Sequence, residues 1–94
     1  MFTVTTPALD RLSHRLAHKK AADDVALRFT RREGGWKLDP DRARPGDVTF
    51  AHDGRNVLLL DEAVSQGMTD LTLDVRTTDA GPRLRLHRIA NRQG

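Results

Sequence analysis

The only tryptophan of the chain, Trp36, follows a short run of charged and flexible residues: Arg31, Arg32, Glu33, Gly34 and Gly35. An indole beside two guanidinium groups can stack on a nucleic-acid base or on a side chain of a protein partner. The same indole can instead cover the open end of a small hydrophobic core while the arginine stems lie around it. The second interpretation is favoured, because one Trp supplies a large share of the apolar surface of a small domain.

A second group of basic side chains lies near the C-terminal end, at Arg76, Arg83, Arg85 and His87. Strand alternation predicts that all four point outward from one hairpin, where they could bind a phosphate or an acidic partner. Asp74 is predicted on the same face, so cross-strand ion pairing with one of the arginines is the simpler interpretation. Binding of a phosphate backbone requires several uncompensated charges acting together.

Metal binding and catalysis have weaker support. His14 and His18 have the i, i+4 spacing of a helical metal site, but they are predicted on the solvent face of the helix, and two histidines without a third ligand in reach make a weak site. His52 beside Asp53 is interpreted as a turn residue, and Asp61-Glu62 as a helix cap. No nucleophile signature or glycine-rich phosphate loop is present. We therefore predict a protein that is not an enzyme and has no metal or other cofactor.

Composition predicts one small globular domain. The chain has 94 residues, 37% hydrophobic and 31% charged, with no cysteine and a formal net charge of +3. Without cysteine, disulfides, thiolate metal sites and thiolate-bound iron–sulfur clusters are excluded for these residues. The sixteen Lys and Arg are interspersed with thirteen Asp and Glu, which is more typical of a solvated surface than of a nucleic-acid-binding stripe. No apolar run is long enough for a membrane helix, and we expect a soluble cytoplasmic protein.

The first half of the chain alternates between helix and strand signals. A helix is predicted from about Thr6 to Lys20, with Thr6 as the N-cap and Pro7 at the first helical position. Residues 25–30 alternate strictly, which predicts a half-buried strand with Val25, Leu27 and Phe29 inward and Ala26, Arg28 and Thr30 outward. The glycine pair predicts a turn, and a possible return strand begins at Trp36. Residues 39–47 are predicted as a loop because of Pro40, Pro45 and Gly46.

The second half reads as two hairpins. The first spans residues 48–60, with a tight turn at Asp53-Gly54 and an apolar run from Val57 to Leu60 that is suited to a strand buried on both faces. Asp61 can cap a short helix or turn, and the second hairpin spans about 71–87. Residues 89–94 are predicted to be a frayed tail. The predicted core consists of Val4, Leu9, Leu12, Leu16, Val25, Leu27, Phe29, Val48, Phe50, Val57, Leu59, Leu71, Leu73, Val75, Leu84 and Leu86.

Three segments in this order carry a family resemblance: "FTVTTPALDRL", "PGDVTFAHDGRNVLLLD" and "LTLD" before the final hairpin. Over roughly residues 2–87 the chain resembles the HesB/IscA-like domain, the A-type carriers of iron–sulfur cluster biogenesis. The resemblance implies an α+β fold, mostly β, in which a sandwich or pseudo-barrel packs against one N-terminal helix. The matching residues are Asp47, Phe50, Gly54, Asp61, Leu73 and Asp74.

The chain departs from the family at the cluster ligands. The carriers hold their cluster with one cysteine after the first long strand and a Cys-x-Cys near the C-terminus. The first position corresponds to the neighbourhood of Glu33 or Gly34, and the second lies at or beyond residues 82–88. Neither contains a thiol, so no ligand can be transferred from the family to this chain.

Two functional hypotheses follow. The leading one is a non-catalytic HesB-like module that lacks the cluster site and acts through contacts with an unknown protein partner, which the resemblance links to iron–sulfur assembly. The alternative is binding of nucleic acid or an acidic ligand through Arg31, Arg32, Glu33, Trp36, Arg83, Arg85 and His87. A third possibility, a homo-oligomeric structural component, rests on the family's habit of self-association. No membrane partner is expected.

Overall fold

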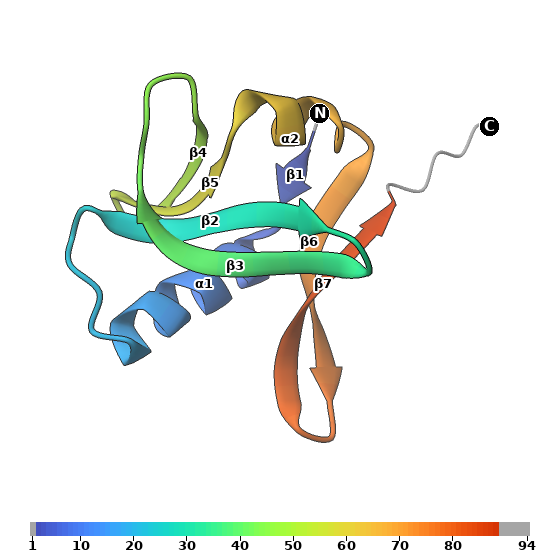
Figure 1. Ribbon diagram of the computed structural model, residues 1–94. Helices are drawn as coiled ribbons and strands as arrows, with labels where there is room; N and C mark the ends of the chain where they lie inside the picture. The colour runs from blue at the N-terminus through green and yellow to red at the C-terminus, as the bar shows by residue number, and fades with distance from the viewer. Residues whose placement is uncertain (1, 89–94) are drawn as a thin grey trace.

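The computed structural model describes residues 2–88 and has an α+β fold made mostly of strands (Figure 1). The predicted fold class is confirmed; the tail predicted at 89–94 lies outside the described residues. The elements in chain order are β1 (Thr3–Val4), α1 (Thr6–His18), β2 (Val25–Arg32), β3 (Gly35–Arg42), β4 (Val48–His52), β5 (Arg55–Leu60), α2 (Glu62–Gln66), β6 (Leu71–Thr78) and β7 (Gly81–Arg88).

The strands form two sheets. In the smaller sheet, of order β1-β6-β7, β1 is parallel to β6, and β6 and β7 form an antiparallel hairpin whose tip extends beyond the body of the domain (Figure 1). In the larger sheet, of order β3-β2-β5-β4, two antiparallel hairpins meet through the parallel pair β2 and β5. Because β3 and β4 are opposite edges of this sheet, residues 43–47 must cross the sheet to connect them.

Helix α1 packs against β2, β4, β5 and β6 and so joins both sheets. Ala8, Leu12 and Leu16 are fully buried on its inner face, as the helical spacing of the leucines predicts. The predicted cap was wrong by one residue: Thr5 is the N-cap and its hydroxyl accepts from the Ala8 N–H at 3.3 Å. The helix ends at His18 rather than Lys20, because Lys20 has a positive φ of 55° that turns the chain toward β2.

Two predictions about the β2–β3 hairpin were wrong. Strand β2 is not half-buried, since Ala26 and Arg28, predicted outward, are only 1% and 8% exposed. Strand β3 also continues to Arg42 through much of the predicted loop, leaving only residues 43–47 without strand structure. Pro40 fits within it because β3 is an edge strand, where a residue without an N–H leaves no partner unsatisfied.

The hairpin turn at Asp53-Gly54 is confirmed, with positive φ values of 54° and 80°. Asp61 caps α2 by accepting from the Val64 N–H at 2.8 Å. Seven residues of the predicted core are fully buried, namely Leu12, Leu16, Leu27, Phe29, Val57, Leu59 and Leu73, and the other nine are half-buried. The predicted core omitted Phe2, Ala8, Ala26 and Met68, which are buried. It also omitted Leu58 and Leu60, but their burial confirms the separate prediction that the run from Val57 to Leu60 is buried on both faces.

Among residues 2–88, no helix is both long and apolar enough to cross a membrane.

Candidate functional site

The β2–β3 hairpin turns at Glu33-Gly34 and presents the first candidate group. Arg31 pairs with Trp36, and Arg32 with Gly35, in the antiparallel register. Trp36 is half-buried and stacks on Phe29, with ring centroids 5.1 Å apart and an interplanar angle of 16°. Because Phe29 is fully buried, this contact makes Trp36 an extension of the core and occupies one of its two ring faces.

Arg31, Arg32 and Glu33 surround that turn and are all exposed. Within residues 2–88 none of the three takes part in an ion pair. The hairpin tip therefore combines an indole committed to internal packing with two cations that remain available for solvent or a ligand.

The second candidate group, on the β6–β7 hairpin, was predicted to contain a cross-strand pair between Asp74 and an arginine. Asp74 lies directly opposite Arg85 in the register, but the contact that its carboxylate makes is with His87, whose Nε2 is 3.8 Å from Asp74 Oδ2. The other oxygen accepts from the Thr5 hydroxyl at 2.7 Å. This hydrogen bond is the main cause of a lowered pKa of Asp74. The carboxylate thus attaches the start of α1 to β6.

The arginines of this hairpin lie on exposed strand positions. Arg76 and Arg83 are directly opposite each other, an unfavourable like-charge arrangement, and both are exposed, as is Arg85. The two candidate groups belong to different sheets: Arg31, Arg32 and Trp36 to β2 and β3, and Arg83, Arg85 and His87 to β7.

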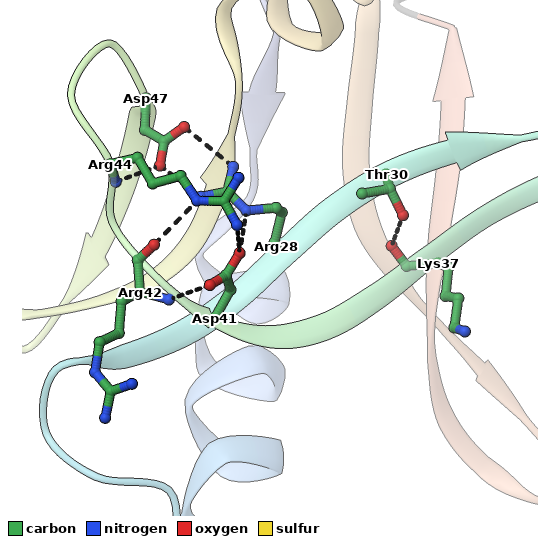
Figure 2. A network of polar contacts seen from close by, with 7 residues as sticks. All are labelled: Arg28, Thr30, Lys37, Asp41, Arg42, Arg44 and Asp47. Carbon is green, nitrogen blue, oxygen red and sulfur yellow. Dashed lines mark hydrogen bonds and ion pairs between the residues drawn. The ribbon is translucent and has the colours of Figure 1, made fainter.

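Sequence reasoning missed the polar network around Arg28 (Figure 2). The Arg28 guanidinium donates from Nε to Asp41 Oδ2 at 2.7 Å and from both terminal nitrogens to the Asp47 carboxylate at 3.0 and 2.7 Å. Arg44 closes the network, with its guanidinium 2.9 Å from Asp41 and its backbone N–H 2.7 Å from Asp47. We call these four residues the Arg28 network.

The electrostatics of the Arg28 network are those of a structural ion-pair cluster. The hydrogen bond from Arg28 is the main cause of the lowered pKa values of both Asp41 and Asp47. In return, Asp47 is the main cause of a raised pKa of Arg28. The two acids and two arginines neutralise each other, so no charge is left over for a ligand. The network attaches residues 43–47, which cross the sheet, to β2.

A signal for the Arg28 network exists in the sequence. Arg28 lies in the apolar run "VALRF", and the connection "DPDRARPGD" supplies the two aspartates. The prediction missed it because strict alternation assigns every second residue of a strand to solvent, and Arg28 is one of those residues.

The described part of the chain contains no cluster of three His, Cys, Asp or Glu residues that could hold a metal. His14 and His18 are exposed on the outer face of α1. His52, predicted as a turn residue, is half-buried, with Nε2 at 3.6 Å from a carboxylate oxygen of both Asp10 and Asp53.

The fold is shared with solved structures at low sequence identity. The crystal structure of Escherichia coli SufA, involved in biosynthesis of iron–sulfur clusters, matches with a TM-score of 0.73 and 21% identity over 93% of this chain and 84% of that chain. A crystal structure of IscA with its 2Fe–2S cluster matches with a TM-score of 0.61 and 19% identity, covering 94% of this chain and 85% of that one.

A solution structure of a protein from Aquifex aeolicus gives a TM-score of 0.63 at 20% identity over 93% of this chain and 90% of that chain. No family model matches the chain, and no curated protein matches its sequence. The protein therefore has the fold of SufA and IscA, which confirms the predicted HesB/IscA-like architecture. It has this fold without a single cysteine among its 94 residues.

Proposed function

We propose that this protein is a module of the SufA/IscA fold that has no cluster site, is not an enzyme and acts through contacts with another protein. One observation carries the proposal: the turn between β2 and β3, which corresponds to the first cluster-ligand position of the resembling carriers, contains Glu33 and Gly34. Thiolates are the usual ligands of such clusters. A single carboxylate at an exposed turn is a poor substitute for them.

The fold suggests the cellular process. SufA is involved in iron–sulfur cluster biosynthesis, and a partner from that machinery is our first candidate. A cytoplasmic location is part of the same proposal. The Arg28 network supports a non-catalytic role, because Asp41 and Asp47, whose pKa values are both lowered, are paired with arginine and hold the fold together.

Anaerobic reconstitution with ferrous iron and sulfide tests this proposal. The purified protein is expected to develop no cluster chromophore after desalting, while IscA, whose structure contains a 2Fe–2S cluster, serves as the positive control treated in parallel. A stable chromophore with stoichiometric iron and sulfide on this protein would contradict the proposal.

The alternative, binding of nucleic acid through the hairpin tip, keeps one supporting observation: Arg31 and Arg32 are exposed and have no ion pair within residues 2–88. It is weakened because Trp36 stacks on Phe29 and offers at most one ring face to a base. A gel-shift titration at low salt decides it, since phosphate binding by these cations must weaken steeply as salt is added.

A further inference from the structure

The positive charge of this protein is concentrated in its first twenty residues. They contain four Lys and Arg and one Asp, a formal net charge of +3, whereas residues 21–94 contain twelve basic and twelve acidic residues. The +3 of the whole chain is therefore the charge of the α1 region. The basic residues are Arg11, Arg15, Lys19 and Lys20.

These four cations have no acidic partner inside the described domain. None of them takes part in an ion pair within residues 2–88. The only acid on α1, Asp10, lies 3.6 Å from His52 instead. The α1 region thus carries uncompensated charge, whereas three of the arginines that follow, Arg28, Arg42 and Arg44, are paired with aspartates.

The surface beside these cations is hollowed. One hollow of about 400 Å³ is lined by Arg11, His14, Arg15, His18 and Lys19. A second, of about 290 Å³, shares Arg11 and His14 and is completed by Pro7, Asp10, Val75 and Pro82. Because they share Arg11 and His14, the two hollows lie next to each other along α1, and we call them together the α1 groove. It is basic toward the C-terminal end of the helix and partly apolar where α1 meets the β6–β7 hairpin.

We propose that the α1 groove binds an acidic peptide segment of a protein partner, with one apolar side chain between Pro7, Val75 and Pro82 and a short run of acidic residues along the helix. This proposal rests on the function proposed above and specifies the surface and the chemistry of the partner. Arg11, Arg15 and Lys19 are four residues apart, which places successive charges about 6 Å from each other on one helix face. Acidic side chains with i, i+4 spacing, or alternate residues of an extended peptide, have a matching repeat.

A peptide fits the groove better than a nucleic acid does. The thirteen residues of α1 span only about 20 Å, a length that a short run of acidic residues in an extended peptide covers completely. Neither hollow is lined by a Phe, Trp or Tyr ring, so the only rings on which a base could stack there are the smaller imidazoles of His14 and His18.

Fluorescence anisotropy with the full chain and labelled synthetic probes tests the proposal. The main probe is a peptide with one leucine followed by a short run of glutamates, and the comparison probes are the same peptide with serine for leucine and a DNA duplex. The test variant combines Arg11→Glu, Arg15→Glu and Lys19→Glu. The matched control combines Arg31→Glu, Arg83→Glu and Arg85→Glu, which changes the net charge equally on exposed positions elsewhere.

We expect the α1 variant to bind the leucine peptide at least about tenfold more weakly than wild type, and the control variant to bind within roughly threefold of wild type. The serine peptide should bind several-fold more weakly than the leucine peptide. A milder variant, with Gln at the same three α1 positions, gives the same direction of change if charge reversal impairs folding.

Equal losses in both variants would overturn the proposal, since binding would then depend on net charge alone. It would also fail if the leucine peptide did not bind, or if the duplex bound more tightly than the peptide and lost affinity in the α1 variant. These outcomes leave the cluster-free function intact. Conversely, a stable cluster on the reconstituted wild-type protein would contradict the cluster-free function, whether or not the peptide binds.

Discussion

The Arg28 network and the α1 groove are both rich in basic side chains, but only the first contains the acids that neutralise them. Arg28 is almost fully buried, and both of its partners, Asp41 and Asp47, are on or next to the segment that crosses the sheet. The cations of the α1 groove line an open hollow and make no ion pair with any acid of residues 2–88.

The difference shows that the location of the acids decides what an arginine does in this domain. Where a connecting segment delivers carboxylates onto a strand, the guanidinium holds the two together and is unavailable to a ligand. In the α1 groove, Asp10 contacts His52 and makes no ion pair with the cations, so their charge is free to attract an acidic partner. The following predictions test this contrast, beginning with the largest expected effect.

Replacement of Arg28 by Met should lower the free energy of unfolding by about 3 kcal/mol, because it leaves the buried Asp47 carboxylate without its main partner. The side chain of Asp47 is only 4% exposed. Urea denaturation measures the change. The control is Arg42→Met, whose ion pair with Asp24 is open to solvent; its loss should cost at most about 1 kcal/mol. If the two substitutions lowered the free energy of unfolding equally, the buried ion pairs of Arg28 would contribute no more to stability than the exposed ion pair of Arg42, which would contradict this prediction.

The Arg28 network should also make stability depend on acid. In the folded state the pKa values of Asp41 and Asp47 lie below the ordinary value of 3.8. Their stabilisation is therefore complete above that value and is lost as the pH falls through the lowered folded-state values. Urea midpoints measured from pH 6 down to about pH 2 should fall steeply below about pH 4 in the wild type and less steeply in Arg28→Met. Parallel curves for the two proteins would contradict this linkage.

Trp36→Ala should cost about 2 kcal/mol of folding free energy, less than a fully buried Trp, because the indole is half-buried against Phe29. Trp36→Phe is the control and should retain most of the stability. If Trp36→Ala unfolds at the same urea concentration as wild type, the indole contributes nothing to the core and is more plausible as a contact for a ligand.

Gln at Arg11, Arg15 and Lys19 together should change the free energy of unfolding by no more than about 0.5 kcal/mol. Lys19 is exposed, Arg11 and Arg15 are only partly buried, and none of the three makes an ion pair within residues 2–88. Urea denaturation alongside Arg28→Met gives the comparison directly. A destabilisation approaching that of Arg28→Met would mean that the α1 cations belong to the fold rather than to a binding surface.

Much of the fold could be predicted because local signals sufficed. Asp53-Gly54 has the conformational freedom that a tight hairpin turn requires, and the spacing of Leu12 and Leu16 places both on one helix face.

The candidate site was harder to predict from the sequence than the fold. The hairpin tip and the final hairpin were identified as exposed basic regions, but the α1 face was assessed only as a weak metal site. Its groove depends on the β6–β7 hairpin, more than fifty residues further along the chain, which supplies Val75 and Pro82.

The sequence by itself determined the alternation of helix and strand, the SufA/IscA-like architecture and the lack of any thiol to hold a cluster. Only the tertiary structure decided that Arg28 is buried, that Pro40 lies in an edge strand and that Trp36 stacks on Phe29. The physical reason is the same in each case. The period of a strand shows which residues share a face. Whether that face is buried depends on which other segment of the chain packs on it, and this is decided only in the folded molecule.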